Sequence, residues 1–220
     1  GDAITTVSHP NLRHLRGLIA VLEHGCISAA AIAVSISQPA LTQGILKLES
    51  QLGEVLFERR SDGIDPTPAG RLVLERATAS MQHLTAGSRL IAGTAFEPDR
   101  RLTMTQLRAF LGLFKAGSFA AAATELGLSQ AAVHRAVREL EEALGKRLVE
   151  RRGRGVHMSF GGRRFARSCW LAVKELQAAL SELGLDPHNP TISIGTTPLA
   201  RAFLVPEAMS MMVAERFPAS

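Results

Sequence analysis

Two clusters of polar side chains in this sequence have the chemistry needed to contact a polyanion. The first cluster is Ser37, Gln38, Thr42, Gln43 and Lys47, on a face that also includes the apolar Pro39. The second cluster is Ser129, Gln130, His134, Arg135 and Arg138. Glutamine can bond adenine at two points, arginine can bond guanine, and a hydroxyl bonds several base edges. Both clusters therefore suit a helix face lying in a DNA groove, although the two serines would cap a helix with or without a ligand.

More arginines follow each cluster at a similar distance. They are Arg59, Arg60, Arg151, Arg152 and Arg154. Arginine at these places suits contact with phosphates or with the minor groove. Alternatively, Arg59 and Arg151 form surface ion pairs with the glutamates that precede them. Arg154 stands between two glycines without an acidic neighbour and is the better candidate, whereas His134 and His157 are more typical of solvated or phosphate-facing side chains than of catalytic ones.

The composition argues against several other classes of protein. The 220 residues carry a net charge of +5 and are 46% hydrophobic, as in an ordinary folded and basic protein. Cys26 and Cys169 lack the spacing of a metal site or a disulfide scaffold. No phosphate-binding glycine loop, hydrolase triad order, membrane-spanning apolar run or signal peptide is evident. We therefore expect a cytoplasmic protein that is not an enzyme and has no metal or catalytic cofactor.

The sequence repeats itself once without gaps. When it is shifted by 92 positions, the segment from Leu15 to Arg71 is identical to residues 107–163 at 20 of 57 positions. The identities include turn glycines and arginines as well as alanines, so similar composition does not account for them. We infer two copies of one module, which are called copy one and copy two below.

Each copy begins with three short helices. In copy one, apolar residues at helical spacing precede Gly25, a short helix covers about residues 28–34, and Ser37 is placed to cap a third helix. Copy two has the same pattern. Three helices in this order are typical of a helix-turn-helix, so the third helices, about 38–52 and 130–144, are the predicted recognition helices.

A hairpin and a longer helix follow in each copy. Two short extended runs around a glycine turn predict a β-hairpin wing. Thr67 and Pro68 then give a cap-plus-proline signal for a long helix, and Ser159 has the cap role in copy two. We therefore expect long helices at 68–92 and 160–184.

The long helices share a heptad seam. Its residues are Val73, Ala77, Ser80, Leu84, Gly87 and Ile91 in copy one, and Phe165, Cys169, Ala172, Leu176, Ala179 and Leu183 in copy two. They either pack on their own module or pair the two helices, and the length of the helices favours pairing. We expect an intrachain pseudo-dimer, a homodimer through the same helices, or both. Residues 94–103 can span up to roughly 35 Å and so can join helix 68–92 to copy two.

These motifs together resemble the N-terminal domain of LysR-type transcriptional regulators. Copy one matches through Ser-Gln-Pro-Ala-Leu-Thr from Ser37, through Leu-Glu-x-x-Leu-Gly-x-x-Leu-Phe-Glu-Arg from Leu48, and through Thr-Pro-Ala-Gly from Thr67. Copy two departs at Ala131, which replaces the proline, and at Ser159, which begins Ser-Phe-Gly-Gly. The family normally has one such domain in each chain. The resemblance implies a bacterial, nucleoid-associated regulator that binds double-stranded DNA in a sequence-specific way.

The resemblance continues past the repeats. Residues 191–218 are similar to the opening strand and helix of the family's effector-binding domain, and so are expected to be the start of a truncated domain. The resemblance implies a small-molecule effector of unknown identity for the full-length protein, with Thr196 and Thr197 where its first effector contacts lie. Another winged-helix regulator with a different sensor, such as a molybdate-responsive type, is the alternative.

The fold predicted from the sequence is mainly α-helical. It has two tandem winged helix-turn-helix domains, each followed by a long linker or dimerisation helix, and a short αβ remnant at the C-terminus. The predicted domains cover residues 11–93, 104–185 and 190–220.

The two copies differ in charge. Residues 11–93 carry a net +1 and residues 94–186 a net +5. We therefore hypothesise that copy two supplies more electrostatic affinity for DNA. The alternative is that only copy two binds DNA and copy one is a dimerisation or interaction module.

Overall fold

The computed structural model describes residues 12–153 and 155–185. Within these residues the fold is mainly α-helical, with two winged helix-turn-helix modules and two long helices, as predicted. The αβ segment expected in residues 190–220, with Thr196 and Thr197, lies outside the described residues.

The chain divides into two compact units. Among the described residues, unit 1 contains 12–79 and 174–185, and unit 2 contains 80–173. Each unit therefore holds the helices and wing of one copy, together with parts of both long helices.

Unit 1 begins with the three helices of copy one. They are α1 (Leu12–His24), α2 (Ile27–Ala33) and α3 (Gln38–Leu52). Gly25 has φ +68°, a backbone conformation that glycine adopts without strain, and so ends α1 as predicted. Leu41, Ile45 and Leu48 are buried along one side of α3, which leaves its other side exposed. The arrangement is that of a helix-turn-helix core.

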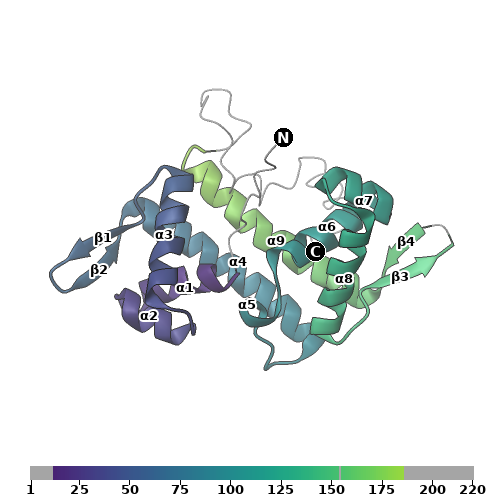
Figure 1. Cartoon of the computed structure of the whole chain (residues 1–220), viewed down its shortest axis with the longest axis horizontal. Helices are drawn as coiled ribbons and strands as arrows, with labels where there is room; N and C mark the ends of the chain where they lie inside the picture. The colour runs from purple at the N-terminus through teal and green to yellow at the C-terminus, as the bar shows by residue number, and fades with distance from the viewer. Residues whose placement is uncertain (1–11, 154, 186–220) are drawn as a thin grey trace, which may run out of the picture. The chain divides into compact units, whose positions relative to one another are not determined.

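The wing of unit 1 is an antiparallel hairpin of β1 (Phe57–Arg60) and β2 (Gly63–Pro66), which extends from the three helices (Figure 1). Near its turn the hairpin is held to the end of α1, because the N–H of Ile64 donates to the Gly25 carbonyl at 3.1 Å. A Cβ atom on Gly63 would lie 2.8 Å from the same carbonyl oxygen. Glycine at position 63 therefore allows the hairpin to approach the turn after α1.

Unit 2 repeats this architecture. Its elements are α5 (Pro98–Arg101), α6 (Met104–Ala116), α7 (Phe119–Leu126), α8 (Gln130–Leu144), β3 (Val149–Arg152) and β4 (Gly155–Met158). Thr103 and Gln106 form a capping box at the start of α6. The short α5 lies in residues 94–103, which the sequence predicts only as the connection to copy two. The Phe110 and Phe165 rings meet in the core with centroids 5.6 Å apart.

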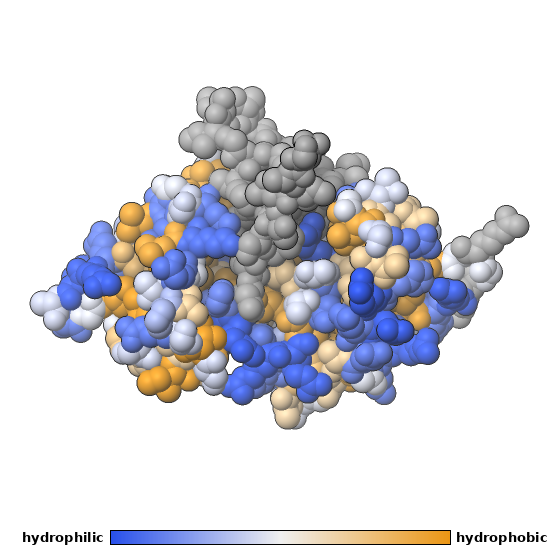
Figure 2. All heavy atoms as spheres, in the orientation of Figure 1, coloured by the Kyte–Doolittle hydropathy of each residue, from blue (hydrophilic) through white to orange (hydrophobic). Residues whose placement is uncertain are grey.

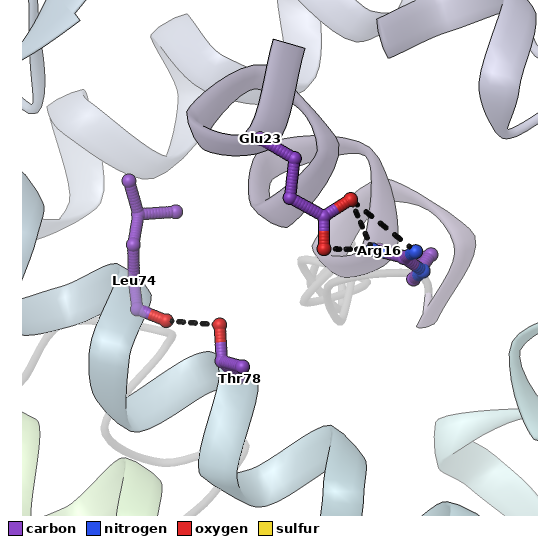
Figure 3. Close-up of polar contacts among 4 residues, drawn as sticks. All are labelled: Arg16, Glu23, Leu74 and Thr78. Atoms are coloured by element: carbon purple, nitrogen blue, oxygen red, sulfur yellow. Dashed lines mark hydrogen bonds and ion pairs between the residues drawn. The ribbon is translucent and has the colours of Figure 1, made fainter.

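The long helices are α4 (Pro68–Ala92) and α9 (Phe160–Glu182). Their bounds agree with the predicted helices to within two residues. None of the twelve seam residues is exposed, and most are buried. Polar side chains outside the seam bond locally: the Thr78 hydroxyl donates to the Leu74 carbonyl one turn earlier in α4 (Figure 3). The same figure shows Arg16 paired with Glu23 along α1.

Within each unit, α4 contacts α9. In unit 1, Arg76 pairs with Glu175 at 2.9 Å and with Glu182. In unit 2, a Cβ atom on Gly87 would lie 2.3 Å from the Ser168 Cβ and 3.7 Å from the Phe165 ring. The two long helices therefore contact each other within one chain.

No single helix in the described part of the chain is long and apolar enough to cross a membrane. The helices α2 and α3 reach that length and composition only as a pair bent by 108°.

Each wing is tied to the third helix of its module by one carboxylate. Glu49 of α3 accepts the N–H groups of Leu56 and Phe57 at 2.8 and 3.3 Å. Glu141 of α8 accepts those of Leu148 and Val149 at 2.7 and 3.0 Å. A charged acceptor makes each of these hydrogen bonds stronger than a neutral one would. The wing therefore cannot shift on the third helix without leaving buried N–H groups unsatisfied.

Replacing Glu141 should loosen the wing of unit 2. Glu141→Ala leaves two backbone N–H groups without an acceptor and should lower the free energy of unfolding by about 1–3 kcal/mol. Glu141→Gln keeps an oxygen acceptor and should lose less. Urea denaturation measures both, and Glu142→Ala is the matched control because that side chain is 68% exposed. An equal loss in the Glu142 variant would contradict this role.

Candidate nucleic-acid interface

The third helix of each module begins with the predicted serine cap. The Ser37 hydroxyl accepts the N–H of Ala40 at 3.2 Å, and the Ser129 hydroxyl accepts that of Ala132 at 3.1 Å. Both serines are exposed, so their side chains also reach solvent. The cap prediction is confirmed, and contact with DNA stays a prediction.

The predicted polar face of α3 lies on its exposed side. The exposed members are Gln38, Pro39, Gln43 and Lys47. Thr42 is half-buried, and its hydroxyl donates to the Gln38 carbonyl at 3.0 Å, which leaves only its lone pairs for another partner. Lys47 also faces His14 of α1: burial lowers the pKa of His14, and the charge of Lys47 lowers it further.

The polar face of α8 is more basic. Gln130, Arg135 and Arg138 are exposed, and Arg138 makes a loose ion pair with Glu142 at 3.6 Å. His134 stacks on Phe119 with ring centroids 3.5 Å apart.

Burial lowers the pKa of His134, and the positive charge of Arg151 lowers it further. The imidazole is therefore neutral at pH 7 and adds a hydrogen-bonding edge rather than a charge.

A groove of about 850 Å³ separates α8 from β3 within unit 2. Arg135 and Arg138 line it from the helix, and Arg147 and Arg151 line it from the chain that enters and forms the hairpin. Phe119 contributes an apolar wall. Glu141 and Glu150 also line the groove, so its four arginines leave it with a net positive charge, which suits a phosphate backbone.

Sequence reasoning missed two residues of this groove, Arg147 and Phe119. Arg147 precedes the hairpin, and three residues separate it from Arg151, the first arginine that was predicted there. A basic residue immediately before a wing was the available signal for Arg147. Nothing local marks Phe119, whose role depends on the fold placing it under His134.

The equivalent surface of copy one is less basic and partly apolar. Under the shift of 92 positions, Leu46 replaces Arg138 and Val55 replaces Arg147. These two side chains are 52% and 60% exposed. Figure 2 shows orange patches among blue ones over α3, and mainly blue over the lower part of α8 and the adjoining hairpin. The two modules therefore share a backbone but present different chemistry.

The hairpin arginines have different surroundings. Arg60 pairs with Asp65 of the opposite strand at 2.9 Å. Arg59 and Arg151 are exposed. Arg152 lies in β3 in register with Gly155. Arg154, the predicted tip of the second wing, lies outside the described residues.

The described residues contain no group of three or more His, Cys, Asp or Glu side chains that could hold a metal ion. Cys26 and Cys169 are free thiols. Burial raises the pKa of the Cys169 thiol, so this sulfur stays protonated.

The surroundings of His134 predict its titration. Its pKa should lie below the ordinary value of about 6.5. As the pH falls from the ordinary pKa of histidine towards the lowered pKa of His134, the unfolded chain takes up a proton before the folded one does. The free energy of unfolding therefore decreases over this pH range. Arg151→Gln should bring the pKa part of the way back, because burial remains. NMR titration of the imidazole measures this, and an unchanged pKa in the variant would show that Arg151 does not act on it.

The sequence was compared with known proteins. The pattern of the bacterial regulatory helix-turn-helix proteins of the lysR family matches residues 12–71 and again residues 104–163, which is more than half of the chain. The HTH-type transcriptional regulator GalR of Pseudomonas putida is 29% identical over 211 residues, 95% of this chain and 53% of that protein. The similarity to GalR therefore extends over both copies.

Two other relatives match shorter segments. The HTH-type transcriptional regulator ClcR of Pseudomonas putida is 49% identical over 78 residues, 36% of this chain and 26% of that protein. The small neutral protease regulatory protein of Streptomyces coelicolor is 42% identical over 94 residues, 41% of this chain and 30% of that protein. This chain spans about half the length of GalR, and the matches cover less of the other two. The chain belongs to the lysR family of bacterial regulatory helix-turn-helix proteins and carries the family's domain twice.

Proposed function

We propose that this protein binds double-stranded DNA and regulates transcription, with α3 and α8 as recognition helices and the two hairpins against the neighbouring backbone. The basic groove between α8 and β3 is the observation that carries the proposal. A helix in the major groove reads bases, while arginines beside it neutralise phosphates. Relatives named as transcriptional regulators support this reading.

The two modules have unequal roles in this proposal. Copy two supplies most of the phosphate contacts, because its groove has four arginines where copy one has Gln43, Leu46, Val55 and Arg59. Copy one contributes weaker and more sequence-selective contacts through Gln38 and Gln43. Because the two faces differ, the preferred DNA site is asymmetric, since operator symmetry follows protein symmetry.

A second function for copy one is supported by the same surface. Leu46 and Val55 are more than half exposed, and Ile32 is 79% exposed. Exposed apolar side chains of this size are typical of protein contacts when they gather in one patch. In this alternative only copy two binds DNA, and copy one is an interaction module.

The organisation of the whole protein is also part of the proposal. Residues 11–93 and 104–185 are the two head-and-linker segments, and 190–220 begin an effector-binding domain. Thr196 and Thr197 are the proposed first contacts with a small-molecule effector. The protein acts at the nucleoid in the cytoplasm and has no catalytic role or cofactor.

The experiment is a DNA-binding comparison between matched pairs of variants. A site is first selected from a random pool, and affinity is then measured by fluorescence anisotropy over a range of salt concentrations. Arg135→Ala with Arg138→Ala should weaken binding roughly 30-fold and reduce the salt slope by about two, because two phosphate contacts are lost. Gln43→Ala with Lys47→Ala should weaken it less and change mainly the sequence preference. Equal losses would overturn the unequal roles, and no loss in either pair would overturn the proposed function.

Replacing Leu46 and Val55 distinguishes a copy one that contacts DNA from a copy one that is an interaction module. If copy one lies against DNA, Leu46→Arg with Val55→Arg should tighten binding several-fold and increase the salt slope. If it is an interaction module, the same change should leave DNA affinity nearly unaltered. The selected site should then contain one half-site instead of two.

A further inference from the structure

Ion pairs join α4 to α9 within unit 1. In unit 1, Arg76 of α4 donates to Glu175 of α9 at 2.9 Å and also pairs with Glu182. The three side chains are 37%, 23% and 39% exposed, so they are partly shielded from solvent. One arginine therefore holds two carboxylates of a single partner helix, and both glutamates raise the pKa of Arg76.

The repeat does not reproduce this cluster. Under the shift of 92 positions, Ser168 is the equivalent of Arg76, His83 of Glu175 and Leu90 of Glu182. If the α4 helices of two chains paired in the same register, each Arg76 would meet His83 and Leu90 of the other. If two α9 helices paired, each pair of glutamates would meet only Ser168. Charge complementarity therefore exists only between α4 and α9.

The shape of the contact in unit 2 also favours α4 against α9 over two α9 helices. A Cβ atom at Gly87 would lie 2.3 Å from the Cβ of Ser168, closer than two carbon atoms can approach. The equivalent of Gly87 in α9 is Ala179, which has that Cβ atom. Two α9 helices in this register would therefore collide at Ala179 and Ser168, whereas α4 with α9 fits.

We propose that α4 selects α9 and rejects a second α4, that α9 likewise rejects a second α9, and that the selected pair forms within one chain. Arg76 with its two glutamates provides the charge selection, and Gly87 against Ser168 provides the steric selection. Each chain then carries its own pair of unlike heads. This goes beyond DNA binding, because it concerns the partner of the linker helices and holds whether or not copy one contacts DNA.

Disulfide trapping tests the partner directly. In unit 2, Ser80 of α4 and Ala172 of α9 are buried seam residues and are equivalent under the shift of 92 positions. In a full-length background of Cys26→Ser and Cys169→Ala, Ser80→Cys with Ala172→Cys should form a link under mild oxidation and stay at the mass of one chain on a non-reducing gel. Either cysteine alone should give no covalent dimer.

The other outcomes overturn the proposal. A covalent dimer from Ser80→Cys alone, or from Ala172→Cys alone, would show that like helices pair between chains. A covalent dimer from the double variant would show that α4 and α9 pair between chains. A double variant with no link would show that they do not pair in this register.

Charge reversal provides a second measurement that does not need the cysteines. Arg76→Glu should lower the thermal midpoint by about 5 °C, because three carboxylates then meet. Adding Glu175→Arg and Glu182→Arg should recover most of this loss. The matched control is Arg71→Glu on the exposed side of α4, which should change the midpoint little. A triple variant no more stable than Arg76→Glu would overturn the charge selection.

Discussion

The carboxylate that accepts two N–H groups at the root of each wing is the interaction on which the DNA-facing surface depends. Glu49 and Glu141 fix the hairpins on α3 and α8. Each long helix also begins close to the root of its own wing. A Cβ atom on Gly70 of α4 would lie 1.9 Å from the Leu56 carbonyl oxygen, and one on Gly162 of α9 would lie 2.1 Å from the Leu148 carbonyl oxygen. This joint holds arginines from the helix and the hairpin around one groove.

The sequence predicted most of the fold because the signals are local. Serine caps, glycine stops and apolar spacing set the helix bounds through bonds to the nearest turn, and the structure agrees with them. The ion pair of the first hairpin was missed for a geometric reason. Adjacent strand residues point to opposite faces, so Glu58 and Arg59 diverge, whereas Arg60 and Asp65 are diagonal neighbours on one face.

The candidate site was predicted less completely than the fold. The α3 and α8 faces follow from helical period alone, so their exposed members were found. The groove needs two elements at once, and no local pattern marks Arg147 or Phe119 as neighbours of His134. The repeat identifies Leu46 and Val55 as the equivalents of Arg138 and Arg147. Their exposure in the structure shows that apolar side chains in copy one replace arginines on the surface of copy two.

The duplication explains why the two copies can differ at the surface and at the seam while sharing a scaffold. In a symmetric homodimer each interface patch must complement itself, so a change at one position occurs on both sides at once. Within one chain, Arg76 can stay in α4 while its equivalent is Ser168, and two glutamates can arise in α9 alone. The same freedom applies to Leu46 and Arg138, because neither head must match its partner. Residues that bond the backbone, such as Glu49 and Glu141, have no such freedom, and they are identical in both copies.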